Sequence, residues 1–133
     1  MRIGNHTVPM TVAASAAGKE GYAVKKSGTA GQVALCSAAT DRPFGIIASV
    51  SEDGLKVDVA LQGSVVRGRL GAAVAAATVQ NLEADADGKL VPFGTGASAG
   101  GGAFTAAQFL GSVDGADDDL VEVLVYITED EAA

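Results

Sequence analysis

The stretch GLKVDVALQG, residues 54–63, alternates apolar and polar side chains with a period of two. Such alternation is typical of a strand that has one face on a core and the other in water. We therefore expect a half-buried β-strand here, preceded by a turn at Glu52-Asp53-Gly54 and followed by another at Gly63. The apolar side of the strand holds Leu55, Val57, Val59 and Leu61.

A related pattern returns 66 residues later in the chain. Residues 44–61, FGIIASVSEDGLKVDVAL, align without a gap on residues 110–127, LGSVDGADDDLVEVLVYI, with four identities in eighteen pairs. The segments GQVAL (31–35) and GKLVPF (88–93) also match, at a slightly different offset. A recurring unit of strand, hairpin turn and strand predicts a chain built from two related β units.

The composition predicts an all-β fold with a core of small and branched side chains. Of the 133 residues 48% are hydrophobic, but only 5% are aromatic and 18 are glycine. Short β-branched runs between turn residues indicate a small antiparallel β-barrel or sandwich, with at most one short helix, in the alanine-rich residues 70–80. The other expected strands lie in residues 22–26, 32–36, 44–50, 64–70, 81–93 and 119–127, of which 81–93 is a hairpin around Asp87-Gly88.

The chain divides into three parts. Residues 1–20 carry Pro9 and few large side chains, which favours an extended N-terminal arm, either an edge strand or a tail that pairs with something else. Residues 21–127 are expected to form a single β domain that contains the glycine-rich loop 94–104. Residues 128–133, TEDEAA, are expected to form an acidic C-terminal tail.

The charge balance bears on the partners of the chain. The formal net charge is −7 and the pI is about 4.4. An acidic surface repels phosphate groups, so we expect neither a nucleic acid nor an anionic membrane as a partner. The apolar stretches are also shorter than the ~20 residues that span a bilayer, so we expect no membrane span.

The sequence holds no recognisable catalytic arrangement. Catalysis needs a nucleophile with a base, a metal cluster, or carboxylates held in a cleft. The single cysteine, Cys36, excludes an internal disulfide and a multi-cysteine zinc site, and the only histidine, His6, lies in a different part of the chain. We expect Cys36 to be an inert buried residue, and we expect no cofactor, no metal and no enzyme activity.

Two motifs imitate binding loops. EADADG, residues 83–88, resembles the start of a calcium loop, but Gly94 stands where the closing acid belongs, and we interpret the motif as a hairpin turn. GTGASA, residues 94–99, fits a dinucleotide-binding pattern. The glycines at 100–102 would break the helix which that pattern must open, so we interpret it as a flexible loop.

Charged residues supply three weaker candidates. The carboxylates of residues 114–119 could hold a hard cation, although a solvated turn is the commoner outcome for such a run. Lys56 resembles the hairpin lysine of biotin- and lipoyl-carrying barrels, but its flanking residues differ, and we expect an ordinary outward-facing lysine. Arg67 and Arg69 share one strand face and could join Lys25-Lys26 in a basic patch against an acidic neighbour.

From residue 21 to 127 the motifs of small and β-branched residues follow this order: YAVKK, GQVAL, FGII, GLKVDVALQG, and a second half that ends in LVEVLVYI. In this order the chain resembles the capsid cement, or head decoration, proteins of tailed bacteriophages. The resemblance implies a structural protein of the virion that binds the outer capsid surface and strengthens the head against internal pressure. It also implies the major capsid protein as partner and a homo-oligomer, with a trimer favoured.

Within this resemblance we place the capsid contact on the arm, because an extended segment can add a strand to the edge of a capsid protein's sheet. The β body would then contribute to self-association. The candidate contact residues are Ile3, His6, Val8, Met10 and Val12.

Two alternatives stay open. One is another structural module of a virion, such as a tail or fibre domain, which would assemble without binding heads. The other is a small β-barrel that binds or carries a ligand, for which we would expect clustered aromatic residues. The two tyrosines and four phenylalanines are instead spread along the chain.

Overall fold

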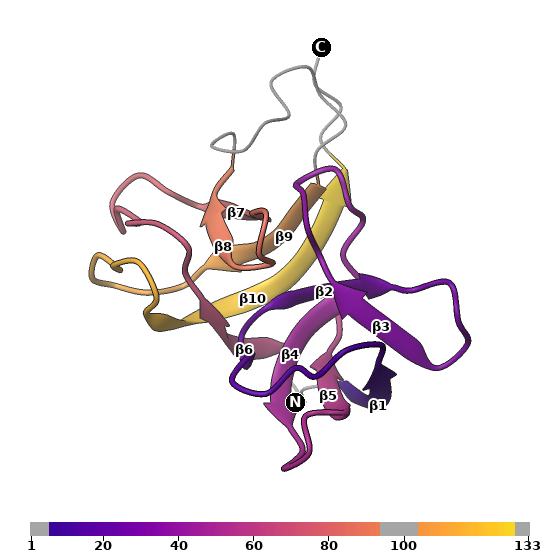
Figure 1. The fold of residues 1–133 in the computed structure, drawn as a ribbon. Coiled ribbons are helices and arrows are strands. Elements are labelled where there is room, and N and C mark those ends of the chain that lie inside the picture. Colours follow the sequence, from indigo (N-terminus) through magenta and orange to yellow (C-terminus); the bar gives the residue numbers. More distant parts are fainter. Residues whose placement is uncertain (1–5, 94–103, 130–133) are drawn as a thin grey trace, which may run out of the picture.

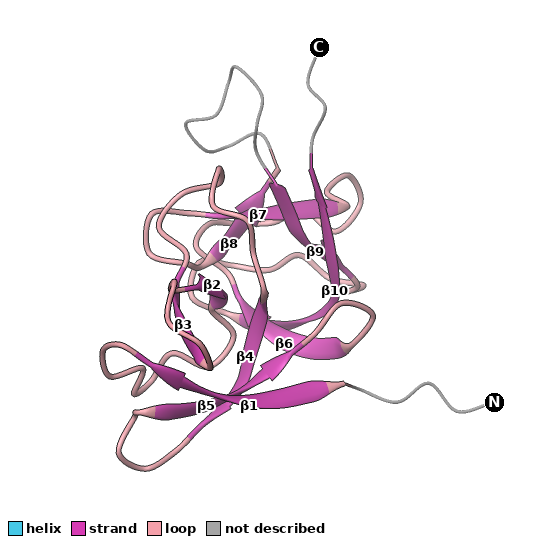
Figure 2. Cartoon of the chain, turned by 90° about the vertical axis from the view of Figure 1, so that its right-hand side faces the viewer, coloured by secondary structure: helices cyan, strands magenta, loops and turns pink. Residues whose placement is uncertain are grey.

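This computed structural model describes residues 6–93 and 104–129 (Figures 1 and 2). These residues contain ten strands and no helix. The first five strands are β1 (Thr7–Val12), β2 (Ala23–Lys26), β3 (Gln32–Leu35), β4 (Gly45–Val50) and β5 (Lys56–Ala60). The other five are β6 (Val65–Arg69), β7 (Asn81–Ala84), β8 (Leu90–Pro92), β9 (Phe104–Phe109) and β10 (Leu120–Glu129). The predicted all-β class is confirmed.

The first five strands close into a barrel in the order β1-β3-β2-β4-β5. Strand β1 pairs with β5 in antiparallel register, from Thr7 opposite Ala60 to Thr11 opposite Lys56. It pairs with β3 in parallel register at Thr11 and Val12 only, so this seam of the barrel is short.

Strand β5 lies within the stretch of residues 54–63 and has the predicted alternation. Val57 and Val59 are buried inside the barrel, whereas Lys56 and Asp58 are exposed. The interior is filled by side chains from all five strands and the β1–β2 connection, which leaves a packed core. Its buried members are Val12, Ala16, Tyr22, Val24, Val33, Ile47, Val57 and Val59.

The last five strands repeat the connectivity of the first five. Their order is β6-β10-β9-β7-β8, and the barrel opened at its β1–β3 seam has the matching order β1-β5-β4-β2-β3. At the corresponding seam Leu70, which directly follows β6, makes one parallel bridge to Leu90 of β8. The two related β units predicted from the sequence are therefore present as two five-stranded units of one topology.

The hairpins β2–β3 and β7–β8 correspond closely in the two units. Both have a glycine with positive φ, Gly31 at 73° and Gly88 at 90°, in the connection before the second strand. Residues with side chains rarely adopt this conformation, which explains why GQVAL and GKLVPF both begin with glycine.

The gapless alignment of residues 44–61 with 110–127 is correct at its end and wrong at its start. Strand β5 does correspond to β10, but residues 110–116 belong to the connection between β9 and β10. The topological counterpart of β4 is β9, a strand that was not predicted from the sequence. The gapless comparison fails because the β9–β10 connection, 110–119, is longer than the β4–β5 connection, 51–55.

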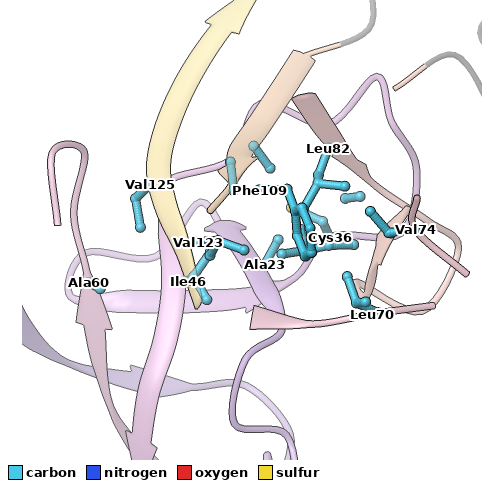
Figure 3. Packing of buried hydrophobic residues seen from close by; sticks show 14 residues of the cluster. Ala23, Cys36, Ile46, Ala60, Leu70, Val74, Leu82, Phe109, Val123 and Val125 are labelled. Atoms are coloured by element: carbon cyan, nitrogen blue, oxygen red, sulfur yellow. The ribbon is translucent and has the colours of Figure 1, made fainter. Parts of the chain in front are cut away.

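The two units share one core. Ala23, Ile46 and Ala60 lie on the outer side of the barrel and pack with Val123 and Val125 of β10 (Figure 3). The adjacent residues along the same strands, among them Val24, Ile47 and Val59, point into the barrel. Strands β2, β4 and β5 are thus buried on both faces where the second sheet covers them, which joins the units into one body. Further members of this core are Cys36, Leu70, Val74, Leu82, Ala84, Leu90, Ala106, Ala107 and Phe109.

Residues 70–80 contain no helix. Val74 forms an isolated bridge with Gly115, and the chain then makes a tight turn in which the Val79 amide donates to the Ala75 carbonyl at 2.9 Å. At the other end, β10 continues to Glu129, two residues beyond the expected limit of the β domain. The rest of the predicted acidic tail, 130–133, lies outside the described residues.

The predicted arm is part of the barrel between residues 7 and 12. Val12 is buried in the barrel core and Val8 and Met10 pack against it, because period-two alternation turns these three side chains inward. The extended arm was expected to be either an edge strand or a tail that pairs with something else; residues 7–12 are a strand that pairs with β5 and β3 of its own chain. The outward side chains of β1 are Thr7, Pro9 and Thr11.

This position of β1 gives a first testable prediction. The substitution Val12→Asp should lower the free energy of unfolding by about 3 kcal/mol or more, because it places an unpaired carboxylate in the barrel core. Thr7→Asp, on the exposed side of the same strand, should change it by less than about 0.5 kcal/mol. Urea unfolding followed by circular dichroism measures both. Equal midpoints for the two variants would show that β1 is dispensable for the barrel.

Candidate functional site

One face of the second sheet is exposed and apolar. Its inner face packs on the barrel, whereas the outer face of β6, β10 and the end of β9 lies in solvent. Six large hydrophobic side chains are exposed among the described residues, and four of them belong to this face. These four are Val65 (37% exposed), Tyr126 (38%), Leu120 (39%) and Leu110 (47%). We call them the sheet face.

The strand register explains how the sheet face is assembled. Val65 lies opposite the half-buried Leu124, and Arg67 lies opposite Glu122, so an apolar pair is followed by a pair of opposite charges. The Leu110 amide donates to the Glu122 carbonyl at 3.1 Å, which holds Leu110 at the edge of this surface. Exposed apolar side chains gathered on one face are typical of surfaces that contact another protein. Here the pair Arg67 and Glu122 lies between Leu120 and the group of Val65 and Tyr126.

The described chain begins next to the sheet face. The His6 amide donates to the Ser64 hydroxyl at 2.8 Å, and that hydroxyl donates to the His6 carbonyl at 3.2 Å. Ser64 is fully buried and directly precedes Val65. Of the predicted contact residues, only His6 is exposed here; Val8, Met10 and Val12 contribute to the barrel core, and Ile3 lies outside the described residues.

A basic hollow lies between the end of β2 and the start of β4. It has a volume of about 400 Å³ and is open to solvent. The Lys26 ammonium lies 5.5 Å from the centre of the Phe44 ring, and the Arg42 guanidinium 5.6 Å from that of Phe104, so both cations rest on aromatic faces. The basic hollow is lined by Lys25, Lys26, Arg42, Pro43 and Phe44.

Asp41 organises the loop that carries Arg42. Its Oδ2 accepts hydrogen bonds from Lys25 Nζ and the Ser37 amide, both at 2.9 Å, and from the Ser37 hydroxyl at 3.1 Å. Burial works to raise the pKa of this carboxyl, but the bonds from Ser37 and Lys25 outweigh it and hold the pKa below its usual value.

The predicted basic patch forms with different members. Lys25 and Lys26 line the basic hollow together with Arg42, which was not among the predicted members of the patch. Arg69 points elsewhere: its Nη1 donates to the Asp118 carbonyl at 3.1 Å. Arg67 lies on the outer side of β6, opposite Glu122.

The acidic residues of the β9–β10 connection serve as turn anchors. Asp114 Oδ1 accepts the Ala76 amide at 2.9 Å, and Asp119 Oδ2 accepts the Ala116 amide at 2.9 Å. Asp118 lies 3.3 Å from the ammonium of Lys89. Because Asp114, Asp118 and Asp119 each have a different partner, these three carboxylates do not converge on one point.

The other motifs are placed as follows. EADADG spans the end of β7 and the β7–β8 turn, and Asp85 Oδ1 accepts the amides of Asp87 and Lys89 at 2.8 and 3.0 Å, as predicted for a hairpin turn. Its first residue, Glu83, is fully buried in β7, which a turn motif does not indicate. Lys56 is exposed on β5, as predicted. GTGASA, residues 94–99, lies outside the described residues.

Cys36 is buried in the shared core. Burial, reinforced by the nearby Asp41 carboxylate, raises the pKa of its thiol to about 12. Only about one thiol in ten thousand would be ionised at pH 8, so this residue is unsuited to act as a nucleophile.

Two further observations concern residues 6–93 and 104–129. They contain no group of three or more His, Cys, Asp or Glu side chains arranged to hold a metal ion. Within the same ranges there is no helix that could cross a membrane.

Comparison with known proteins adds no assignment. The chain matches none of the protein-family models, and no curated protein is detectably similar to it.

The sheet face was missed at the level of sequence, although DLVEVLVYI carries a signal for it. A strand with one solvent-facing side should alternate apolar and polar residues, but here only Glu122 interrupts the apolar residues on the second side. Apolar residues on both sides of a strand indicate either burial on both faces or a surface that meets another molecule. In β10 the inner side is buried, and Leu120 and Tyr126 on the outer side are exposed.

The environment of Asp41 predicts a pH-dependent stability. Asp41→Asn should lower the free energy of unfolding at pH 7 by about 1 kcal/mol, because it weakens the bonds from Lys25 and Ser37. The pKa of this carboxyl is lower in the folded protein than in the unfolded protein, where it is about 3.9. Its contribution to the free energy of unfolding is therefore fully present above about pH 3.9 and is lost as the pH falls through the folded pKa. The difference between variant and parent should therefore shrink below about pH 4. Asp87→Asn, in an exposed turn, is the control; a difference that stays constant with pH would contradict this account.

The burial of Cys36 predicts slow modification. At pH 8 the folded protein should react with a thiol reagent such as 5,5′-dithiobis(2-nitrobenzoate) at least about a hundredfold more slowly than the same protein in urea. Absorbance at 412 nm, the wavelength of the released thiolate, follows the reaction. Equal rates in both conditions would show that the shared core is open to solvent at this point.

Proposed function

We propose that this chain is a structural protein of a tailed-bacteriophage virion that binds the outer surface of the capsid and stabilises it. The observation that carries the proposal is the sheet face: four exposed hydrophobic side chains on one face of a sheet whose other face is buried. The order of the small-residue motifs supports it, because it resembles that of capsid cement proteins. The partner in this proposal is the major capsid protein.

The shape of the molecule suits a mechanical role. Two five-stranded units with one core resist deformation as a single body, so binding energy at the surface is not spent on ordering the protein. The face is also small for a single stable interface, and several copies bound around one symmetry axis would hold more firmly than one. We therefore also propose a homo-oligomer on the capsid, with a trimer favoured.

The contact proposed here differs from the one expected on the arm. Strand β1 has its partners within the chain, and Val8, Met10 and Val12 stabilise the barrel. His6 is fixed to Ser64 at the edge of the sheet face. We accordingly place the capsid contact on the sheet face and keep His6 as a candidate at its edge. Ile3, which lies outside the described residues, stays a candidate from the sequence alone.

The alternatives have less support. A carrier barrel needs room for a ligand, and the interior of this barrel is filled by valine, isoleucine and tyrosine side chains. A tail or fibre module could use the same sheet face on a partner other than the capsid. Binding to heads separates these two proposals.

Co-sedimentation with undecorated heads of the phage that encodes this chain tests the proposal. The wild-type protein should pellet with the heads, and the amount bound should reach a plateau as the protein concentration rises. The bound protein should be visible on the heads by electron microscopy. The double variant Val65→Asp/Tyr126→Asp should bind at least about a hundredfold more weakly, since each apolar side chain lost from an interface costs about tenfold.

Leu55→Asp is the matched control. Leu55 is also exposed, at 48%, but it lies in the β4–β5 turn of the barrel, away from the sheet face. This variant should bind heads like the wild type, and all variants should show the same thermal unfolding midpoint. A wild-type protein that stays in the supernatant, or a double variant that binds normally, would count against the proposed function.

A further inference from the structure

The β9–β10 connection, residues 110–119, presents an apolar side chain on an anchored turn. Val113 is 74% exposed, the largest exposed fraction among the large hydrophobic side chains of the described residues. Val74 and Gly115 exchange two main-chain hydrogen bonds, both 2.9 Å long, which fix the turn to residues 70–80. The Asp118 amide also donates to the Leu70 carbonyl at 2.7 Å. A side chain so exposed on a fixed turn is available for contact at little cost in conformational entropy.

Carboxylates surround this apolar tip. Asp114 and Asp117 are both exposed beside it, whereas the carboxylate of Asp118, also exposed, lies 3.3 Å from Lys89 and 3.8 Å from Arg69. The turn therefore combines one protruding hydrophobic group with a local excess of negative charge. We call residues 113–118 the acidic knob.

The basic hollow has the complementary character. Phe44 and Pro43 supply apolar lining, and Lys25, Lys26 and Arg42 supply positive charge. Asp41 neutralises only one of these three cations, through its bond to Lys25. In a chain with a formal net charge of −7, a hollow with a local excess of cations favours an acidic occupant.

The main chain of Lys26 offers further contacts in the hollow. Along β2 successive residues direct their main-chain groups to alternate sides: the Ala23 carbonyl accepts from Cys36, and the Val24 carbonyl accepts from Phe44. The main-chain amide and carbonyl of Lys26 therefore point toward the side on which β4 pairs with β2. Strand β4 starts only at Gly45, opposite Val24, so no described strand pairs with Lys26 on that side.

We propose that the acidic knob of one copy of this chain binds the basic hollow of a second copy. Val113 would pack on Phe44 and Pro43, and the flanking carboxylates would meet Lys26 and Arg42. The volume of about 400 Å³ is ample for a valine side chain and the groups beside it. The inference deepens the proposed function and rests on it for the assembly of several copies on one surface.

The positions of knob and hollow determine the kind of assembly. The β9–β10 connection lies at the left of Figure 1, whereas the β2–β3 hairpin next to the hollow extends to the right. A contact between two different surfaces of identical chains is head-to-tail, so each copy can bind one neighbour on either side. Such a contact closes into a ring or continues as a chain.

A charge exchange tests the contact in solution, without heads. Lys26→Glu and Asp117→Lys should each weaken self-association by at least about tenfold, and the double variant Lys26→Glu/Asp117→Lys should restore it, because the pair of opposite charges is re-formed in reverse. Val113→Ser should weaken it by about tenfold through the lost apolar contact. Sedimentation velocity over a range of protein concentrations measures the association.

The controls are charge reversals at exposed sites outside both surfaces. Lys56→Glu on β5 and Asp87→Lys in the β7–β8 turn should associate like the wild type. A wild-type chain that stays monomeric up to about 1 mM would overturn the inference, and so would a double variant that self-associates as weakly as the two single variants. Failure here leaves head binding by the sheet face intact, whereas loss of head binding with normal self-association would count against the proposed function alone.

Discussion

The burial of three barrel strands on both faces is the constraint on which the rest of the structure depends. In β2, β4 and β5 one set of side chains fills the barrel and the next set packs against the second sheet. Alanine at positions 23 and 60 lets the sheets approach closely there, and Ile46 fills the space between them. Neither unit could keep this core dry alone, because removing one would expose the apolar outer side of the other. The two units therefore form one body, and the direction in which each surface points is fixed relative to the others.

The same constraint decides which surfaces remain for contact with other molecules. The inner side of β10 is committed to the core through Val123 and Val125, so the outer side alone is available. The acidic knob and the basic hollow, in contrast, are built from connections that leave the sheets. The knob is fixed by main-chain bonds to residues 70 and 74, and the hollow by the bonds of Asp41. Contacts made through such fixed loops lose little entropy on binding, which matters when each interface is small.

How much could be predicted from the sequence depended on whether the signal was local. Strand β5 was predictable because its polar side is solvated along Lys56 and Asp58, and the β7–β8 hairpin because its turn needs glycine. Strand β9, FTAAQF, was not, since alanine, threonine and glutamine carry little strand pattern and the glycine-rich residues before it resemble a loop. The role of β1 was hidden for another reason: its alternation was visible, but its partner β5 lies about 50 residues away. The sheet face depends on pairing between β6 and β10, which is equally distant in the sequence.

The two units share one topology but differ in closure, and this difference bears on function. In the first unit β1 pairs with both β5 and β3, so the barrel closes and its polar side chains face outward. In the second unit the corresponding seam is reduced to the bridge between Leu70 and Leu90, and the buried side chains of Leu70 and Val74 contribute to the core there. Among the described strands, the exposed large apolar side chains occur on this open unit, at Val65, Leu120 and Tyr126. The closed first unit thus contributes stability, and the second unit carries the exposed surface through which we propose the protein binds.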